Sequence, residues 1–569
     1  MPRPRRWQLL PRAPAEHFQR FQHLPGFVAQ ILHNRGICDP QVANDFLSGP
    51  EALSFGDPLE LKDVDKAVSR LLQALDRQEI IAVYGDFDVD GITAVALLTL
   101  ALRELGATVI PYIPHRVDEG YGLNTQALEN LRAEGASLVV TVDCGIGSPA
   151  EVAHANRLGM DVIVTDHHHV PLELPLALAV IDPKQSDCRY PHKELAGVGL
   201  AFKVIQAMTE SLGATPVAAM DPNQYLDLVA LGTVADLAPL IGENRKLVKL
   251  GLLALNDTER PGLQEMILKA RLQLGQLDTY AISFILGPRL NAAGRIESAL
   301  TSLNLLLTDS LEQARELAES LETLNQERQR LTSSAVDKAK NEVHELADDA
   351  LLLIAGEDYP AGIVGLVANK LVEEFYRPSI VVEKGALHCR GSARSIPEFD
   401  IVSALDECQD LLLGHGGHRQ AAGFTVTADN LPLLRSRLLE IARRQLFGLD
   451  LQPTLYLDAL LELNQVTWEN YDWISRLAPY GYGNPQPILL SRRARVKDYR
   501  LVGTNGNHLK LKLTDGRLTW DAIGFRLGDK AREIALNPWV DLAYTLEINE
   551  WNGAKTLRLN LRGIRPSTS

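Results

Sequence analysis

The sequence predicts an α/β protein with parallel sheets, followed by a long connecting helix, a second α/β domain and a small C-terminal β-barrel. From Leu71 to about Ile181, short β-branched runs alternate with helical patterns, which is typical of a parallel sheet. From Thr308 to Leu346 the chain contains no Gly or Pro and is rich in Glu, Arg, Gln and Leu, which predicts one long exposed helix. Beyond Pro453, short alternating strands follow one another with a single short helical segment, as in a barrel.

The bulk composition is that of a folded protein with several cores. A chain of 569 residues is too long for one core, and 46% hydrophobic with 23% charged residues excludes disorder. The longest apolar run, near Thr93 to Leu102, is too short to span a membrane, so we expect a cytoplasmic protein without a membrane partner. The five cysteines are scattered and form no Cys-x-x-Cys pair, so we expect reduced thiols without a disulfide framework or a zinc ribbon.

Charge is distributed unevenly along the chain. The net charge is −15, yet residues 491–569 carry 15 Lys and Arg against 8 Asp and Glu. This excess predicts an anionic partner for the C-terminal end, although a solvated charged face would have the same composition.

Three of the predicted strands end in an aspartate. Asp86, Asp143 and Asp166 follow the runs IIAVYG, SLVVTV and MDVIVT. In open parallel sheets the ligand crevice lies at the carboxyl ends of the strands, so we expect these side chains to converge.

The first of these aspartates opens the motif Gly85-Asp-Phe-Asp-Val-Asp90-Gly91, in which three carboxylates alternate. Clustered carboxylates repel one another unless cations lie between them. The pattern also resembles a calcium EF-hand loop, but the twelfth position is Leu97 where a Glu is required, and a strand precedes the motif where a helix should. We therefore reject the calcium loop, while a solvated acidic turn remains an alternative for this motif taken alone.

Histidines and a further acid extend the acidic set. Asp166 is followed by His167, His168 and His169, and Asp236 lies in an otherwise apolar segment where an unpaired carboxylate is costly to bury. Oxygen and imidazole ligands without thiolate favour hard or borderline divalent ions such as Mn²⁺ or Mg²⁺ over structural zinc.

The motifs GDFDVDG, TVDCG, VTDHH and GTVADLAPL resemble the four core motifs of the DHH phosphoesterases, and the whole chain resembles the RecJ single-strand-specific exonucleases. The resemblance includes RVDEGYG from Arg116, GPRLNAAGR from Gly287, GSARS from Gly391 and GGH from Gly416. It implies a two-domain DHH-type catalytic core with an OB-fold after it.

By this resemblance, two metal ions would be held by Asp88, Asp90, Asp143, His167 and Asp236, with Asp86, Asp166 and His168 as further catalytic residues around them. Two ions about 3.5–4 Å apart can activate water and stabilise the leaving oxygen without a protein nucleophile. In agreement, the sequence has neither a Gly-x-Ser-x-Gly elbow nor a phosphate loop of the NTPase type.

Arginines with small neighbours suit phosphate, because guanidinium binds it as a fork and glycine permits close approach. The candidates for substrate binding are Arg116, Arg289, Asn291, Arg295, Ser392 and Arg394. Without the family, each arginine is equally explained by a structural ion pair. His418 is a candidate catalytic or substrate-contacting residue, and the family implies a grip on the 5′ end of the strand.

The C-terminal barrel combines its basic excess with aromatic side chains, which single-strand binding requires. Tyr499, His508 and Trp551 are the candidate DNA contacts there, and other aromatic residues of the barrel must form its core.

We expect five segments: an N-terminal helical region (1–50), the DHH catalytic domain (51–305), the connector helix (306–347), the DHH-associated α/β domain (348–450) and the OB-fold (453–569). The resemblance implies a 5′→3′ exonuclease that degrades single-stranded DNA to mononucleotides in recombination and repair. A helicase and a single-stranded-DNA-binding protein are the expected partners, and nothing requires more than a monomer.

Two other functions remain open from the sequence. One is a DHH enzyme that acts on short RNAs or cyclic dinucleotides, although such enzymes are typically shorter and lack a basic barrel. The other is a non-catalytic DNA scaffold with the same fold, which predicts lost ligands, whereas every acidic motif is present.

Overall fold

The computed structural model describes residues 5–50, 55–116, 118–213, 220–346, 348–551 and 553–567. By its internal contacts the chain forms two compact units. The first spans Phe55–Pro453, and the second combines the described residues of Arg5–Ser54 with those of Thr454–Ser569.

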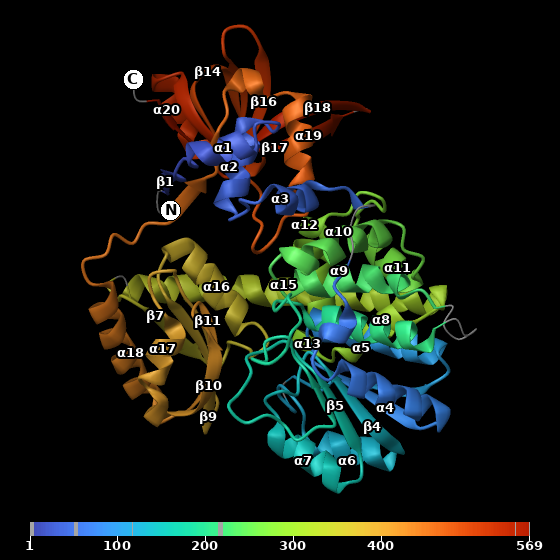
Figure 1. Cartoon of the computed structure of the whole chain (residues 1–569). Coiled ribbons are helices and arrows are strands. Elements are labelled where there is room, and N and C mark those ends of the chain that lie inside the picture. Colours follow the sequence, from blue (N-terminus) through green and yellow to red (C-terminus); the bar gives the residue numbers. More distant parts are fainter. Residues whose placement is uncertain are drawn as a thin grey trace. The chain divides into compact units, whose positions relative to one another are not determined.

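The first unit begins with a five-stranded parallel sheet of order β3-β2-β4-β5-β6. Its strands are β2 (Ile80–Gly85), β3 (Thr108–Tyr112), β4 (Ala136–Val142), β5 (Asp161–Thr165) and β6 (Ala179–Ile181). One face packs on α4 (Val64–Asp76), α5 (Val89–Glu104) and α8 (Gly197–Leu212), and the other on α6 (Thr125–Ala133) and α7 (Pro149–Arg157) (Figure 1). Strand β2 follows the two-residue period: Ile81 and Val83 enter one core, while Ala82 and Tyr84 enter the other.

A helical layer follows the sheet. It consists of η4 (Pro222–Tyr225), α9 (Leu226–Ala235), α10 (Gly242–Asn256), α11 (Pro261–Lys269), α12 (Thr279–Ala281), the π-helical turn η5 (Ile282–Leu286), α13 (Gly287–Ile296) and α14 (Leu300–Leu307). The long helix α15 (Leu311–Val343) begins at Ser310, whose hydroxyl accepts a hydrogen bond from Gln313 N, and ends in the 3-10 turn η6 (His344–Leu346). The sequence predicts an exposed helix here, but one face is buried against α11, α13 and α14, because alanine and leucine recur there at helical spacing.

The second sheet of this unit has the order β10-β11-β9-β8-β7. Its elements are β7 (Leu352–Gly356), α16 (Val364–Phe375), β8 (Ser379–Glu383), β9 (His388–Arg394), α17 (Ile401–Asp406), β10 (Leu412–His418), β11 (Ala421–Thr427) and α18 (Leu431–Leu446). The sheet is mixed: β7 and β8 are parallel, but β8, β9, β11 and β10 pair antiparallel. Short connections without a crossover helix join β8 to β9 and β10 to β11, so those pairs cannot be parallel.

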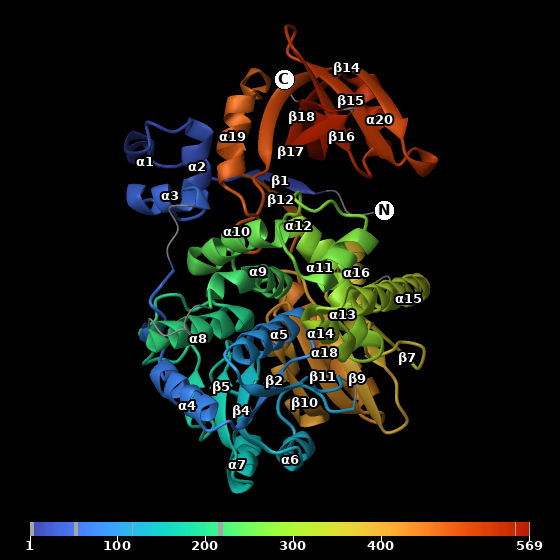
Figure 2. The same ribbon diagram turned by 90° about the vertical axis from the view of Figure 1, so that its right-hand side faces the viewer.

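The second unit contains a closed barrel of β14 (Leu489–Val502), β15 (His508–Thr514), β16 (Thr519–Gly524), β18 (Ala554–Pro566) and β17 (Trp539–Trp551), in that order. Strand β14 pairs with both β15 and β17, which closes the barrel. The short elements α19 (Trp468–Arg476) and α20 (Ala531–Leu536) accompany it (Figure 2).

The N-terminal helices belong to the barrel unit. Strand β1 (Arg6–Leu9) pairs in parallel with β12 (Thr454–Leu457), and β13 (Ala459–Leu460) pairs with β14. Helices α1 (Ala15–Arg20), α2 (Gly26–Asn34) and α3 (Pro40–Leu47) contribute apolar side chains to the same core as the barrel. Within the described part of the chain, no helix is long and apolar enough to cross a membrane.

Candidate active site

Acidic side chains gather at the carboxyl ends of neighbouring strands of the first sheet. Asp86 follows β2, Asp143 follows β4 and Asp166 follows β5, and these strands are adjacent. All three are buried, with exposed fractions of 5%, 3% and 1%. Asp143 has a φ of 59°, a left-handed conformation that costs energy for a residue with a β-carbon and is typical of functional strand ends.

The start of α5 supplies two more carboxylates. Asp88 is the N-cap residue and accepts hydrogen bonds from the backbone N–H groups of Asp90 (2.9 Å) and Gly91 (3.2 Å). Asp90, in the first turn, is fully buried and accepts from the backbone N–H groups of Gly197 (2.6 Å) and Val198 (2.9 Å) at the start of α8. Two helix N-termini therefore stabilise negative charge at this point.

The two histidines after β5 differ in charge. Burial opposes charge on Asp166 and His168, but the 2.7 Å hydrogen bond from His168 Nδ1 to Asp166 Oδ1 lowers the pKa of Asp166 and raises that of His168 to about 9. Burial and the charge of His168 lower the pKa of His167, whose Nε2 lies 2.9 Å from Asp143 Oδ1 and 3.8 Å from Asp90 Oδ2. These shifts favour the cationic form of His168 and the neutral form of His167, and neutral imidazole is the form that can bind a metal ion.

Asp236 comes to the cluster from the end of α9, where its backbone N–H donates to Gly232 O at 2.9 Å. A β-carbon on Gly232 would lie 2.3 Å from Thr93 Oγ1 and 2.8 Å from Asp90 Oδ1. Only glycine permits this approach of α9 to α5, so the GTVAD motif positions Asp236 as well as supplying it.

Three overlapping sets of side chains place their ligand atoms within 4.8 Å of one another. They are Asp90 with His167 and Asp236, Asp86 with Asp88 and Asp143, and Asp143 with His167 and His168.

Burial, with repulsion from neighbouring carboxylates, raises the pKa of Asp86, Asp90, Asp143 and Asp236. Asp86 Oδ1 is buried and has no hydrogen-bond partner among the described residues. Bound cations would relieve both penalties, and oxygen with imidazole donors suits Mn²⁺ or Mg²⁺. The residues therefore fit divalent metal ions.

Two residues beside the cluster were not among the predicted site residues. Asp182 follows β6 and is 1% exposed; burial raises its pKa to about 7, and its Oδ2 has no hydrogen-bond partner among the described residues. Tyr121 Oη lies 3.0 Å from His168 Nδ1 and donates to Asp143 O at 3.3 Å. The run LALAVI ends in Asp182 as the other strands end in theirs, so the same rule would have found it.

Two arginines form a cationic patch beside the cluster. Arg394 Nη1, at the end of β9, donates to Ser392 Oγ at 3.1 Å, and the Arg116 guanidinium lies 4.6 Å from the Phe87 ring centroid. Burial lowers the pKa of both arginines, and the charge of Arg116 lowers that of Arg394 further. Neither forms an ion pair in the described part of the chain, and a β-carbon on Gly365 would lie 3.0 Å from Arg394 Nη2. The nearby charges of Asp86 and Asp88 partly offset the burial of Arg116. Half-buried guanidinium groups that form no ion pair of their own suit a phosphate.

A third arginine extends this patch. Arg295 Nη1, from α13, donates to Gly362 O at 3.1 Å; burial lowers the pKa of Arg295 to about 9, and the charges of Arg116, Arg328 and Arg394 add to the effect. A small cavity of about 110 Å³ is lined by Asn291, Arg295 and Arg328, among others. Arg328, on α15, is a basic residue that the sequence motifs did not single out.

Two other predicted residues have different surroundings. Arg289 Nε donates to Glu322 Oε2 of α15 at 2.7 Å, so the structural ion pair considered for these arginines is present here. His418 is exposed at the end of β10, an edge strand of the second sheet, and no contact among the described residues links it to the carboxylate cluster.

The barrel separates its aromatic residues into core and surface. Trp520 and Tyr544 are buried in the core, whereas Tyr499, Phe525 and Trp539 are 39%, 55% and 45% exposed. The ring of His508 lies 5.3 Å from that of Phe525, centroid to centroid. The side chain of Trp551 lies outside the described part of the structure.

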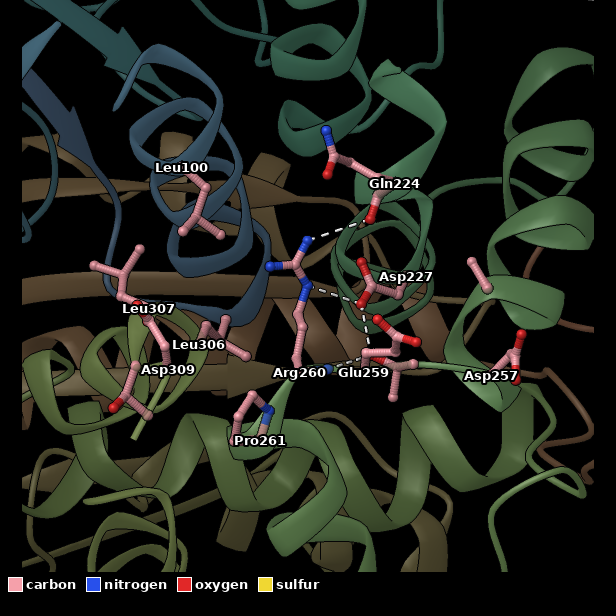
Figure 3. Close-up of a pocket in the computed structure, with 13 residues that line it drawn as sticks. Leu100, Gln224, Asp227, Asp257, Glu259, Arg260, Pro261, Leu306, Leu307 and Asp309 are labelled. Atoms are coloured by element: carbon pink, nitrogen blue, oxygen red, sulfur yellow. Dashed lines mark hydrogen bonds and ion pairs between the residues drawn. The ribbon is translucent and has the colours of Figure 1, made fainter. Parts of the chain in front are cut away.

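A larger cavity of about 460 Å³ lies elsewhere in the first unit and includes no predicted site residue (Figure 3). Arg260 lines this cavity; its Nε donates to Asp227 Oδ2 at 2.8 Å and its Nη2 donates to Gln224 O at 3.3 Å. Asp227 is 3% exposed, and Thr258 Oγ1 also donates to it. These contacts satisfy the buried carboxylate, so this is a structural ion pair at the rim of a cavity.

Three family models match the chain in order. They are the N-terminal domain of the DHH family at residues 80–233, the DHHA1 domain at 348–444 and the RecJ OB domain at 457–563.

Curated relatives match over nearly the whole chain. The single-stranded-DNA-specific exonuclease RecJ of Bacillus subtilis is 40% identical over 95% of this chain and 68% of its own length. The Escherichia coli protein of the same name is 35% identical over 95% of this chain and 96% of its own.

Solved structures agree with these relatives. RecJ of Thermus thermophilus in complex with Mn²⁺ matches with a TM-score of 0.84 at 31% identity, covering 99% of this chain and 80% of that one. Its complex with Mg²⁺ matches with a TM-score of 0.78 at 30% identity, covering 99% and 79%. The ordered family matches, the curated relatives and these structures agree, and the chain belongs to the RecJ family.

Proposed function

We propose that this protein is a 5′→3′ exonuclease that hydrolyses single-stranded DNA to mononucleotides with two metal ions, in DNA recombination and repair. The observation that carries the proposal is the convergence of buried carboxylates and histidines on one sheet edge, beside the patch of Arg116, Arg295 and Arg394. The relatives named as single-stranded-DNA-specific exonucleases support the same activity.

The metal ions would be held by Asp88, Asp90, Asp143, His167 and Asp236. When bound, Mn²⁺ or Mg²⁺ lowers the pKa of water and neutralises charge that develops on the phosphate. The backbone N–H groups at the start of α8 fix the Asp90 carboxylate, and His167 enters as a neutral imidazole.

His168 supplies a proton and a positive charge. Asp166 engages Nδ1 of His168, which fixes the ring and keeps it cationic at neutral pH. The Nε2–H of His168 is then the group that donates to a phosphate oxygen as charge accumulates there. Asp86, at the same edge, completes the acidic surroundings of the metal ligands.

The arginine patch would set the 5′→3′ direction of degradation. Arg116, Arg394 and Ser392 present donors that form no ion pair with the described residues, so they suit the terminal 5′-phosphate of a strand whose first phosphodiester lies at the metal cluster. Arg295 and Asn291 would bind the next phosphate, and His418 would contact the strand from the second sheet. Arg289 would act indirectly, through α15.

The barrel would hold the strand further along. Its exposed Tyr499 and the His508 ring provide stacking surfaces among cations, and Trp551 is proposed with them. We further propose that the protein works as a monomer in the cytoplasm, on strands delivered by a helicase and a single-stranded-DNA-binding protein.

The test is digestion of a 5′-labelled and a 3′-labelled single-stranded oligonucleotide, and of its duplex, with Mn²⁺, with Mg²⁺ and with chelator. We expect labelled mononucleotide at once from the 5′-labelled single strand, late release from the 3′ label, and none from the duplex or with chelator. Early release of labelled mononucleotide from the 3′-labelled strand would contradict the 5′→3′ direction. Cleavage of dinucleotides alone would favour the small-substrate DHH enzyme.

Variants separate catalysis from binding. Asp90→Asn should lower cleavage by more than about a hundredfold while single-strand affinity is retained, because the ligand set is broken and the barrel is untouched. The exposed Asp65→Asn on α4 is the matched control and should cleave normally. A wild-type chain that binds but never cleaves would establish the scaffold function instead.

The phosphate patch has its own test. Arg394→Ala should reduce the preference for a 5′-phosphate over a 5′-hydroxyl end, whereas Arg330→Ala, exposed on α15, should not. An unchanged preference in Arg394→Ala would place the end-recognition site elsewhere.

A further inference from the structure

The barrel unit contains a second group of metal-ligating side chains, which has no part in the proposed nuclease site. His17 lies on α1, His33 lies near the end of α2, and Cys38 lies between α2 and α3. Their ligand atoms lie within 4.8 Å of one another. The three residues come from separate elements of the N-terminal region, so their meeting depends on the fold.

The turn after α2 explains why Cys38 returns to His33. Gly36 has a φ of 74° and donates from its backbone N–H to His33 O at 2.9 Å, and Ile37 N donates to Leu32 O at 2.9 Å. This is the hydrogen-bond pattern of a glycine-terminated helix, which reverses the chain. It places Cys38 Sγ 3.9 Å from His33 Nδ1. In a tetrahedral zinc site, sulfur and nitrogen ligands lie about 3.5 Å apart, so only a small closing movement is needed.

His17 is oriented as a ligand. It is 5% exposed, and its Nε2 lies 2.8 Å from Ala29 O, to which it donates. This hydrogen bond fixes the orientation of the ring. A backbone carbonyl that accepts from the far ring nitrogen is the usual support of a metal-bound histidine. The His17 and His33 rings are neighbours, with centroids 5.0 Å apart.

We propose that His17, His33 and Cys38 bind one Zn²⁺ ion, with water as the fourth ligand. A thiolate with two imidazoles is a soft to borderline donor set that selects zinc over Mn²⁺ or Mg²⁺, in contrast to the carboxylate cluster. A carbonyl contact alone would explain a buried histidine, but it would not bring an exposed thiol and a second imidazole within 4.8 Å of a ligand atom of the same ring. The ion would join α1, α2 and the turn before α3.

Cobalt substitution tests the site in the full-length chain. Co²⁺ added to metal-free protein should produce the near-ultraviolet charge-transfer band of a thiolate ligand, and one equivalent of Zn²⁺ should abolish it. Cys38→Ser should lose the band entirely. Because Cys38 is exposed, this variant should remain folded, which circular dichroism checks.

Two controls localise the signal. His23→Ala removes an exposed histidine of the same region that is not part of the group and should keep the band. Asp143→Asn perturbs the carboxylate cluster and should also keep it. Absence of the band in wild type, or its persistence in Cys38→Ser, would overturn the proposal.

A second measurement does not depend on cobalt. Zn²⁺ should protect Cys38 from alkylation by iodoacetamide in wild type, and His33→Gln should abolish this protection. Equal alkylation rates with and without Zn²⁺ in wild type would contradict the site.

Discussion

Gly232→Ala should damage catalysis more than stability. A β-carbon at this position of α9 would lie 2.3 Å from Thr93 Oγ1, 2.8 Å from Asp90 Oδ1 and 2.8 Å from Val198 Cγ1. All three atoms belong to buried residues of α5 and α8, so α9 has to move away from them. Asp236 ends the same helix and moves with it.

Two opposing effects determine the stability change. Replacing a helical glycine by alanine contributes about 1 kcal/mol through helix propensity, whereas overpacking a core costs about 1–3 kcal/mol. The net loss is therefore roughly 0–2 kcal/mol, or a few degrees in the unfolding midpoint. Displacing a group that orients metal ligands lowers metal affinity or activity by about 10–100-fold.

The assay pairs a thermal unfolding curve with the rate of mononucleotide release as a function of Mn²⁺ concentration. Gly251→Ala, on α10, is the matched control. A β-carbon there would lie 2.3 Å from Leu226 O and 2.7 Å from Ala230 Cβ, both of which belong to α9. It strains α9 without touching the carboxylates. Thr93→Ala in the Gly232→Ala background removes the closest contact and should restore part of the activity.

Wild-type rates in Gly232→Ala would refute the reasoning. Equal losses of activity in Gly232→Ala and Gly251→Ala, at equal stability, would also refute it, since the effect would then be general to α9.

Three further predictions concern stability and binding. Arg260→Met should lower the free energy of unfolding by about 3 kcal/mol because it leaves the buried Asp227 carboxylate without its cation, and a loss below about 1 kcal/mol in denaturant unfolding would contradict this. Burial opposes ionisation of Glu79, but its hydrogen bond with Arg70 lowers its pKa on folding. The ion pair therefore stabilises the fold above the unfolded pKa of about 4.3, and this stabilisation is lost as the pH falls through the folded pKa. Glu79→Gln should therefore reduce the loss of stability at acid pH in a stability–pH curve. An unchanged acid limb would show that the ion pair does not cause that loss. Phe525→Ala should weaken binding of single-stranded DNA by about 1–3 kcal/mol in fluorescence anisotropy with the barrel still folded, and unaltered affinity would exclude it as a stacking surface.

The sequence predicts the catalytic sheet well because its signal is local. Each strand is a short apolar run, and the aspartates that follow the strands must meet once the strands are parallel neighbours. The predicted β-barrel and the connecting helix rest on equally direct periodicities, and both are present.

Other features depend on contacts that no local pattern contains. The ion pair of Arg289 with Glu322 joins two helices, and the burial of one face of α15 depends on which helices pack there. The mixed order of the second sheet arises from its short connections, since alternation does not distinguish parallel from antiparallel pairing.

The pairing of β1 with β12 has a consequence for synthesis. Arg6 lies opposite Thr454, so the two strands leave the ribosome about 450 residues apart. At a synthesis rate of about 5–20 residues per second, β12 is made roughly 20–90 s after β1. During that time the first unit can fold, while the N-terminal helices have no barrel to cover their apolar faces. The apolar side chains of these helices, which the finished protein buries, therefore stay exposed until the barrel strands have been synthesised.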